Sequence, residues 1–291
     1  MQALKIVVTI PTYNEAENIE RLVRAILALD EHFEVLVADD NSPDGTAQLV
    51  AALADVEPRA HLLLRLADQG RGYAGRDAFV WALEHGADIV FEMDADFSHD
   101  PVHLPAMVAA LADSDVVLGS RQVPGGQDLG RSIWRVGLTR ASNFFVRTVL
   151  RLPVRDCNSG YRGFWRHTLE RIDVRHAFSS GPAIVHELLF KTHRAGLRIR
   201  EVPICFRERE LGSSTLTFRK LLRSYVNVLR LAWMDLRGEL RTSAAAPVSE
   251  RAPDREQALA TTPANTDAPP AALSPRASPT RPADDAAART K

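Results

Sequence analysis

Short apolar strands alternate with helical segments over about the first 120 residues, and this alternation constrains the fold more than any other feature of the sequence. Runs of β-branched and other apolar residues predict strands. They lie at residues 4–10, 33–38, 62–66, 89–93 and 116–118. Apolar residues at helical spacing predict helices at 15–29 and 46–53, another that ends at 79–85, and one that begins near Pro101. This order predicts an α/β fold in which helices flank both faces of a mostly parallel sheet.

Polar clusters directly follow three of the predicted strands, at residues 11–15, 39–46 and 94–100. In open parallel sheets, ligands bind beyond the carboxyl ends of the strands. We therefore expect side chains from the three clusters to meet in one crevice. The side chains concerned are those of Tyr13, Glu15, Asp40, Asp94 and Asp96.

Asp94 and Asp96 stand two residues apart after the fourth predicted strand, and in an extended segment this spacing points both carboxylates to one side. A divalent cation relieves the repulsion between them, and Mg²⁺ or Mn²⁺ prefers such oxygen ligands while leaving positions open for phosphate. The alternative is a solvated acidic loop or a helix cap before Pro101, and an Asp-x-Asp pair alone is weak support for a metal site. The two further clusters at neighbouring strand ends favour a site for a metal and a diphosphate.

The other two clusters also have simpler interpretations. Ser-Pro-Asp-Gly at 42–45 is strong turn chemistry, and Pro11 and Tyr13 could end a strand and pack in the core. The functional alternative places Asp40 against a base or ribose, and the face of Pro11 or Tyr13 against a nucleobase. A turn and a binding loop are compatible at 39–46, so both interpretations can hold there.

Composition divides the chain near residue 240. Residues 241–291 are rich in Ala, Pro, Ser, Thr, Asp and Arg and contain no aromatic residue. Such a segment cannot bury enough apolar surface to offset its ordering entropy. We therefore predict one folded domain at 1–240 and a disordered tail at 241–291.

Charge, cysteines and hydropathy narrow the cellular setting. The net charge of −1 gives no general attraction for nucleic acid, although residues 121–171 are rich in arginine and leave room for a local anionic partner. Two cysteines, Cys157 and Cys205, fit a reducing compartment better than a disulfide framework. The start of the chain lacks a signal-peptide pattern, and no stretch reaches about 18 consecutive apolar residues. We expect a cytoplasmic protein, free or peripheral on the inner face of the membrane, with no nucleic-acid partner.

Residues 218–236 carry apolar residues at helical spacing, with Arg and Lys between them. This pattern is typical of an amphipathic helix that rests on an anionic membrane. It is equally typical of a C-terminal helix that packs on the sheet or on a partner protein. The sequence favours neither interpretation.

The polar clusters and several shorter motifs together resemble one enzyme family. The motifs are Pro-Thr-Tyr-Asn-Glu at 11–15, the loop at 39–46, Met-Asp-Ala-Asp-Phe-Ser-His at 93–99, Gly-Ser-Arg at 119–121 with Pro-Gly-Gly at 124–126, Asp-Cys-Asn-Ser-Gly-Tyr-Arg at 156–162 and Glu-Val-Pro-Ile at 201–204. Their order resembles that of the inverting family 2 glycosyltransferases, which have the Rossmann-like GT-A fold. More narrowly, the sequence is similar to the polyprenol-phosphate (dolichyl-phosphate) mannosyltransferases, from about residue 5 to 225.

The resemblance implies inverting transfer of mannose from GDP-mannose to a polyprenyl monophosphate, with Mg²⁺ or Mn²⁺ as the cofactor. Positions that match the family's donor-binding residues are Pro11, Tyr13, Glu15, Ala38, Asp40, Asp94, Ala95, Asp96, Arg121 and Arg209. The metal ligands implied are Asp94 and Asp96, with Ser98 as a further ligand. The catalytic positions implied are Asp96, Arg121, Arg135 and Thr139. Arg135 and Thr139 match an Arg-x-x-x-Ser element that meets the acceptor phosphate, with Thr in place of Ser.

A phosphate acceptor also has mechanistic consequences. Its oxygen is already anionic, so attack at the anomeric carbon requires no strong general base. Catalysis then depends on positioning and on charge neutralisation by the metal, Arg121 and Arg209. A lipid acceptor further implies that a membrane surface or a membrane-embedded partner protein lies near the site.

The sequence departs from the family pattern in two places. The family's Gly-x-Ser-Lys appears as Gly-Ser-Ser-Thr at 212–215, so Thr215 stands where a lysine is expected, and Arg219 or Lys220 could compensate. The segment at 70–76 is an imperfect copy of the family's Gly-Leu-Gly, with Arg71 between the first two glycines. The lost lysine leaves open transfer of another hexose from a UDP-sugar. The non-enzymatic alternative is a nucleotide-sugar-binding protein that has lost activity.

Overall fold

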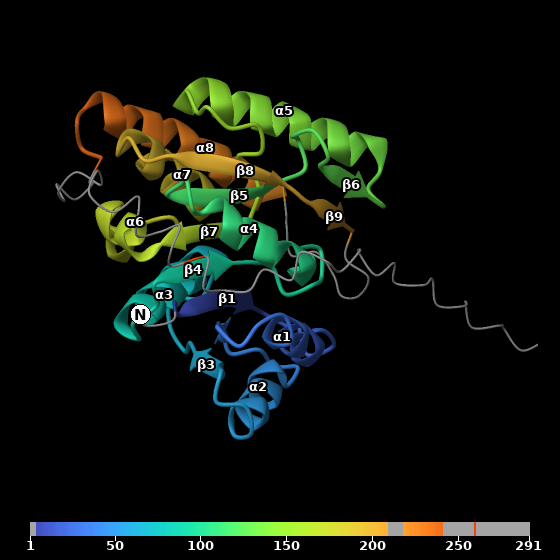
Figure 1. The fold of residues 1–291 in the computed structure, drawn as a ribbon. Helices are drawn as coiled ribbons and strands as arrows, with labels where there is room; N and C mark the ends of the chain where they lie inside the picture. The colour runs from blue at the N-terminus through green and yellow to red at the C-terminus, as the bar shows by residue number, and fades with distance from the viewer. Residues whose placement is uncertain (1–3, 209–217, 241–258, 260–291) are drawn as a thin grey trace, which may run out of the picture.

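The computed structural model describes residues 4–208, 218–240 and 259 of the chain. Its main sheet has seven strands in the order β3-β2-β1-β4-β7-β5-β8 (Figure 1). The bounds of these strands are β1 Ile6–Thr12, β2 Phe33–Asp39, β3 Ala60–Leu64, β4 Ile89–Glu92, β5 Val116–Ser120, β7 Arg162–Trp165 and β8 Ile199–Pro203. All neighbouring strands are parallel except β7, which runs antiparallel to both β4 and β5. The predicted fold class, a mostly parallel sheet flanked by helices, is confirmed.

Helices cover both faces of this sheet, which is why its central strands are mostly apolar, with the buried Glu92 of β4 and Arg162 of β7 paired with each other. The helices are α1 Ile19–Leu27, α2 Thr46–Ala54, α3 Arg71–Glu84, α4 Leu104–Ala110, α5 Ile133–Leu150, α6 Arg166–Arg171, α7 Ile184–Arg194 and α8 Phe218–Leu236. Buried side chains of α1, α2 and α4 pack together on one face of the sheet. Those of α3 and α5 to α8 form the second core on the other face. The chain thus builds two hydrophobic layers around one rigid sheet.

The predicted elements of the first half are confirmed in type and order, with small shifts at their ends. The third strand lies two residues earlier than predicted, because Leu66 is largely exposed after the strand has ended. The first helix begins at Ile19 rather than at residue 15. Its predicted first turn is instead a loop, because the backbone N–H groups of Asn14 and Glu15 donate to side chains of the next loop.

The second half contains elements that sequence periodicity did not predict. Strands β6 Gln127–Leu129 and β9 Cys205–Arg207 form a separate two-stranded parallel sheet. The short 3₁₀ helix Val174–His176 follows α6. The helix predicted to begin near Pro101 does begin there, as the 3₁₀ helix Pro101–His103 that leads into α4. The helix predicted at 218–236 is present as α8, and it packs against both α5 and α7 (Figure 1).

The C-terminal segment lies almost entirely outside the described residues, and so does the prediction that it is disordered. Leu259 is the described residue of that segment, and it is partly buried against the core of α1, α2 and α4. No helix among the described residues is both long enough and apolar enough to cross a membrane.

Candidate active site

The loops that follow β1 and β2 are joined by hydrogen bonds from the backbone of one to side chains of the other. The N–H of Asn14 donates to Ser42 Oγ at 2.9 Å, and the N–H of Glu15 donates to Thr46 Oγ1 at 3.0 Å. Asn14 adopts a left-handed φ of 61°, a conformation that asparagine tolerates better than most residues. The first two polar clusters therefore form one unit at the carboxyl edge of the sheet, as predicted.

Asp40 connects this unit to the first turn of α3. Its carboxylate accepts the N–H of Gly70 at 2.7 Å and is paired with the guanidinium of Arg65. Both members of this ion pair are buried. Arg65 also reaches Asp77, farther along α3, at 2.9 Å. Asp40 thus positions the start of α3, and its predicted contact with a nucleoside stays a prediction.

The Asp94-Ala95-Asp96 motif follows β4 directly, as predicted, and its two carboxylates differ in exposure. The side chain of Asp94 is 36% exposed, whereas Asp96 is buried. Asp96 accepts the N–H of Ser98 at 3.1 Å, across Phe97, whose φ of 57° is left-handed. This tight turn places a buried carboxylate, a half-exposed carboxylate and the buried Ser98 within one short loop.

The buried His99 holds the same loop through a backbone hydrogen bond and a ring contact. Its Nδ1 accepts the N–H of Asp94 at 3.1 Å, and its ring stacks on Tyr161 with 5.0 Å between centroids. Burial lowers the pKa of His99, which outweighs the opposing charges of Asp94 and Asp96. A neutral ring can accept this hydrogen bond, whereas an imidazolium could not.

The donor set of the motif fits a hard divalent cation. Two carboxylates supply oxygen ligands of the kind that Mg²⁺ and Mn²⁺ prefer. The part of the chain that the structure describes holds no group of three or more His, Cys, Asp and Glu side chains arranged around a metal position. A metal at Asp94 and Asp96 would therefore complete its coordination with water, Ser98 or phosphate oxygens of a bound substrate.

Arg71, in the first turn of α3, is the cation nearest to this motif. Its Nη2 donates to Asp94 Oδ1 at 2.7 Å, and its Nη1 lies 3.6 Å from Glu92 Oε1. Glu92 is fully buried at the end of β4 and is also paired with the buried Arg162 of β7. Burial by itself lowers the pKa of Arg71, but the charges of Asp94 and Glu92 raise it above the ordinary value. Arg71 is therefore a charged residue between the two acids.

A second group of arginines lies beside the loop after β5. The guanidinium of Arg121 binds the buried carboxylate of Asp156 in a bidentate manner, at 2.7 Å and 2.8 Å. Burial by itself raises the pKa of Asp156. The hydrogen bonds and charge of Arg121 lower this pKa by more, so that it lies below its ordinary value. The predicted phosphate-binding role of Arg121 therefore has to coexist with a strong structural ion pair.

The predicted acceptor element starts α5, and its two residues have different partners. Arg135 is exposed and pairs with Glu208 just after β9. Thr139 Oγ1 accepts a hydrogen bond at 3.0 Å from Arg131, which also pairs with Asp128 of β6 at 3.0 Å. Arg131 is thus the cation in direct contact with Thr139.

Phe206 of β9 connects the metal motif to the arginines. Its ring lies 5.7 Å from that of His99, centroid to centroid. The guanidinium carbons of Arg121 and Arg131 lie 4.9 Å and 5.7 Å from the Phe206 centroid. Cations over an aromatic face are stabilised by its quadrupole. The fold therefore brings residues from β4, β5, β6, α5 and β9 to one place.

The remaining predicted site residues lie near the carboxyl ends of β1, β2 and β4 or outside the described residues. Tyr13 is about half exposed, Pro11 and Glu15 are partly buried, and Ala38 is fully buried beside Pro11 in the β1–β2 register. Ala95 packs in the core of α1, α2 and α4. Arg209 and Thr215 lie outside the described residues, as does Lys220 as a side chain.

Sequence reasoning missed several residues of the site, namely Arg71, Glu92, His99, Arg131, Asp156 and Phe206. Arg71 was visible only as a departure from the family's Gly-Leu-Gly. Asp156 stood in a recognised motif, but nothing in its spacing from Arg121 indicates a bidentate pair across 35 residues of chain. Such partners are set by β5 and β7 lying side by side.

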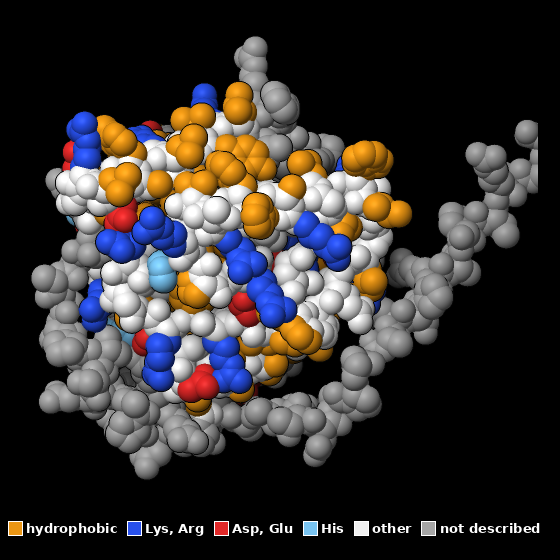
Figure 2. Space-filling view, turned by 90° about the horizontal axis from the view of Figure 1, so that it is seen from above, with side chains coloured by type: hydrophobic (Ala, Val, Ile, Leu, Met, Phe, Trp, Pro, Cys, Tyr) orange, Lys and Arg blue, Asp and Glu red, His pale blue; other side chains and the backbone are white. Residues whose placement is uncertain are grey.

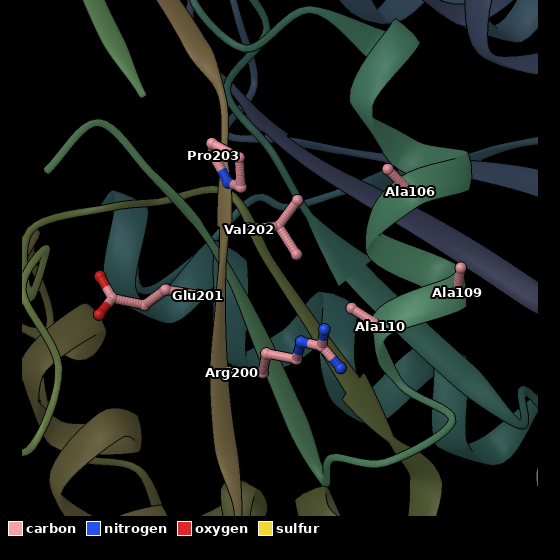
Figure 3. Close-up of a pocket in the computed structure, with 7 residues that line it drawn as sticks. All are labelled: Ala106, Ala109, Ala110, Arg200, Glu201, Val202 and Pro203. Atoms are coloured by element: carbon pink, nitrogen blue, oxygen red, sulfur yellow. The ribbon is translucent and has the colours of Figure 1, made fainter. Parts of the chain in front are cut away.

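A groove elsewhere on the surface contains none of the predicted site residues. It lies between α4 and β8, where Arg200 and Val202 point toward the alanines of the helix and Glu201 points away (Figure 3). The carboxylate of Glu201 accepts the N–H groups of Arg155 and Asp156, at 2.8 Å and 3.0 Å. Glu201 therefore steadies the loop that carries the partner of Arg121.

Comparison with known proteins agrees with this geometry. Residues 7–173 match the family described as glycosyl transferase family 2. The chain therefore belongs to glycosyl transferase family 2, and it is a glycosyltransferase.

Two relatives cover most of the chain. It is 38% identical over 241 residues to the undecaprenyl-phosphate mannosyltransferase of Micrococcus luteus. The match covers 81% of this chain and 99% of that protein. It is 36% identical over 235 residues to the polyprenol monophosphomannose synthase of Mycolicibacterium smegmatis, which spans 80% of this chain and 88% of that protein.

Solved structures support the fold at lower identity. One is glucosyl-3-phosphoglycerate synthase from Mycobacterium tuberculosis in complex with Mn²⁺, UDP-glucose and phosphoglyceric acid, with a TM-score of 0.61 and 22% identity over 79% of this chain and 80% of that chain. Another is mannosyl-3-phosphoglycerate synthase from Rubrobacter xylanophilus, with a TM-score of 0.56 and 21% identity over 85% of this chain and 79% of that chain.

Proposed function

We propose that the chain transfers mannose from GDP-mannose to a polyprenyl monophosphate, with inversion at the anomeric carbon. The observation that carries this proposal is the Asp94-Ala95-Asp96 carboxylate pair, whose neighbour His99 contacts the same Phe206 ring as Arg121 and Arg131. A diphosphate donor suits the first group and an anionic acceptor suits the second. The names of the two relatives support both the mannose and the polyprenyl phosphate.

Asp94 and Asp96 would hold Mg²⁺ or Mn²⁺, with Ser98 as a further ligand. When bound, the metal supplies positive charge that stabilises the leaving diphosphate. The Mn²⁺ named with UDP-glucose in the related solved structure supports a divalent metal here without favouring manganese over magnesium. The N–H of Ser98 holds the Asp96 carboxylate, and His99 holds the backbone N–H of Asp94, so the loop is positioned before the donor arrives.

The joined loops after β1 and β2 would hold the nucleoside. Tyr13 offers a half-exposed ring, and Pro11 and Ala38 are neighbours in the sheet beneath it. Glu15 and Asp40 would bind polar atoms of the base or ribose. Because hydrogen bonds join the two loops, they would need little rearrangement to accept a nucleotide.

The acceptor phosphate would meet Arg135, Thr139 and Arg121. Their guanidinium and hydroxyl groups can donate hydrogen bonds to phosphate oxygens. An anionic phosphate oxygen is itself the nucleophile, so these residues orient it and offset the repulsion between two phosphates. No proton has to be removed for this attack.

A second donor is favoured by one observation, the replacement of the family's lysine by Thr215. The alternative is transfer of another hexose from a UDP-sugar to the same acceptor. The reaction class is unchanged in this case, since the lipid phosphate and the metal motif are shared.

A donor panel tests the function directly. Purified protein is incubated with radiolabelled GDP-mannose, UDP-glucose or UDP-N-acetylglucosamine and a polyprenyl phosphate, with and without a chelator. We expect a lipid-linked product from GDP-mannose that the chelator abolishes. Product from a UDP-sugar alone would overturn the mannose assignment. Asp96→Asn should lower turnover at least about 100-fold, whereas Asp100→Asn, outside the proposed ligand set, should not.

We further propose that the face formed by α5 and α8 rests on an anionic membrane surface, where the acceptor lipid is found. The two helices are joined by an edge-to-face contact of Phe145 and Tyr225, at 5.3 Å. Large apolar side chains on this face are exposed, among them Ile133, Trp134, Leu138, Phe144, Leu222, Val226, Leu229, Trp233 and Leu236. Figure 2 shows hydrophobic side chains gathered across this face with Lys and Arg side chains along it.

Charge supports a lipid occupant for the α5–α8 face. Helix α5 contains three arginines and no acidic residue, a composition that suits anionic headgroups. We place the site on the cytoplasmic side of the membrane, and the free thiols of Cys157 and Cys205 support that side.

Co-sedimentation with vesicles tests this surface. Binding should require phosphatidylglycerol and should fall strongly in Trp134→Glu, whereas Val56→Glu, also at an exposed apolar residue but beyond α2, should bind as the unaltered protein does. If both variants still bound the vesicles, the lipid-facing role of α5 would be overturned. Retention only on membranes that contain other proteins would favour a membrane-embedded partner instead.

A further inference from the structure

The packing at the start of α3 holds Arg71 beside the Asp94-Ala95-Asp96 motif. It lies in the first turn of α3, where the N–H of Gly72 donates to Ser180 O at 3.1 Å. A Cβ added at Gly72 would lie 2.0 Å from Ser179 O, so the backbone at this point has no room to shift. The start of α3 is therefore wedged in place, and Arg71 is carried with it to the metal motif.

The side chain of Arg71 is 27% exposed and lies beside Gly160. A Cβ added at Gly160 would lie 2.7 Å from Arg71 Nη2 and 3.5 Å from Asp94 Oδ1. Gly160 thus leaves space that the guanidinium and the carboxylate share. Nη1 of Arg71 and Oε1 of Glu92 are both buried without a hydrogen-bond partner, 3.6 Å apart. Nη1 therefore faces Glu92 inside the protein, whereas Nη2, which binds the partly exposed Asp94, is the donor that a new acceptor could take over.

Electrostatics make this arrangement depend on what occupies the motif. A divalent cation at Asp94 and Asp96 would take the carboxylate that Arg71 now binds. A guanidinium beside that cation would then be repelled by it. Its remaining counter-ion would be Glu92, which Arg162 shares, so it would be drawn to a further anion nearby. The diphosphate that the metal itself attracts is such an anion, and the planar guanidinium binds phosphate oxygens well.

We propose that Arg71 is a donor-binding residue that exchanges Asp94 for the donor's diphosphate when the metal binds. This inference rests on the proposed function, since it takes the metal and the diphosphate donor from it. Without a metal, Arg71 neutralises Asp94 and competes with the metal for it.

If Arg71 competes with the metal and also binds the donor, its removal should strengthen metal binding and weaken nucleotide binding. A purely structural role of Arg71 would not give these opposite effects. In Arg71→Leu, the affinity for Mn²⁺ alone should rise several-fold, because Asp94 loses its competing ion pair. At saturating Mn²⁺, the affinity for GDP and for UDP should each fall about tenfold, the typical effect of one hydrogen bond to a charged group. Isothermal titration calorimetry measures all three, without any transfer activity.

Arg175→Leu is the matched control. It removes a half-exposed arginine that pairs with Glu84 at the other end of α3, and it should leave the affinities for Mn²⁺ and for both nucleotides unchanged.

The remaining outcomes are decisive as well. Weaker binding of both Mn²⁺ and nucleotide in Arg71→Leu would make Arg71 a structural clamp and overturn the proposal, and so would no change in either. Binding of UDP but not GDP by the unaltered protein would refute the mannose donor yet leave Arg71 testable with UDP. Binding of neither nucleotide would refute both proposals.

Discussion

Arg121 and Arg135, the described arginines expected at the phosphates, both have carboxylate partners in the folded chain. The Arg121–Asp156 pair is buried and bidentate, whereas the Arg135–Glu208 pair is exposed. An exposed pair is worth little and can open for a phosphate, but a buried pair cannot be broken cheaply. Arg135 is thus the better candidate to rearrange, while Arg121 can offer only those donors that Asp156 leaves available.

Asp156→Asn should be strongly destabilising for this reason. It leaves the Arg121 charge buried without its counter-ion, which costs about 3–5 kcal/mol in the free energy of unfolding. Urea unfolding measures the loss. Glu84→Gln, which breaks the exposed pair with Arg175, is the matched control and should cost less than about 1 kcal/mol. Equal losses in the two variants would contradict the assignment.

His186 makes stability depend on pH. Burial, and secondarily the charge of Arg162, lower the pKa of His186 to about 4, and its Nε2 lies 3.0 Å from Asn158 Oδ1. The unfolded chain binds this proton with a pKa of about 6.5, so it takes up more protons than the folded chain between pH 6.5 and 4. The contribution of His186 to stability is therefore complete above that window and is lost as the pH falls through it.

The expected loss from His186 is on the order of 3 kcal/mol over the window. Unfolding free energies at several pH values between 4 and 7 measure it. His186→Gln should show a shallower decline than the unaltered protein over the same range. Parallel declines would mean that His186 does not titrate differently in the two states.

At the scale of elements, the position of the α3 N-terminus determines the site, because it meets Asp40 through Gly70 and Asp94 through Arg71. Two glycines in helices should respond to alanine in opposite directions. Gly72→Ala would place a Cβ 2.0 Å from Ser179 O and should cost at least about 1–3 kcal/mol. Gly137, in α5, has nothing within 4 Å of the added Cβ, and Gly137→Ala should stabilise by about 0.5–1 kcal/mol.

Thermal or urea unfolding of the two glycine variants decides this. A stabilised Gly72→Ala would show that α3 is not wedged against residues 179–181 and that Arg71 is free to withdraw from the motif. A destabilised Gly137→Ala would show that the α5 surface is covered in the free protein. The expected opposite signs exclude a general effect of alanine on helices.

At the scale of the whole molecule, every described member of the two cores except Leu259 lies within residues 4–240. We predict that a chain ending at residue 240 folds cooperatively and keeps its transferase activity. Removing Leu259 should lower the free energy of unfolding by about 1 kcal/mol, since the side chain is only partly buried. Calorimetry and the donor assay measure the two properties. Loss of the folding transition would contradict the predicted domain boundary.

The sequence was sufficient for the fold class and for the place of the Asp94-Ala95-Asp96 motif after β4, because both depend on local patterns. The apolar runs of β1, β2 and β4 and the polar residues that follow them are contiguous in the chain. The shifted third strand and the late start of α1 were not predictable, because side chains of a distant loop, Ser42 and Thr46, decide where the first helix begins. Local sequence patterns determined the type of each element, whereas tertiary contacts determined where the elements begin and end.

The same division holds for the site. By itself, the sequence determined that Asp94 and Asp96 follow a buried strand and that arginines suited to phosphate occur at 121 and 135. Only the tertiary structure decided that Arg121 is held by Asp156 and that Arg71, on another helix, binds Asp94. The physical reason is that charge partners are chosen by distance in space. Strand pairing and the wedge at Gly72 set those distances, and neither is written in the spacing of the charged residues.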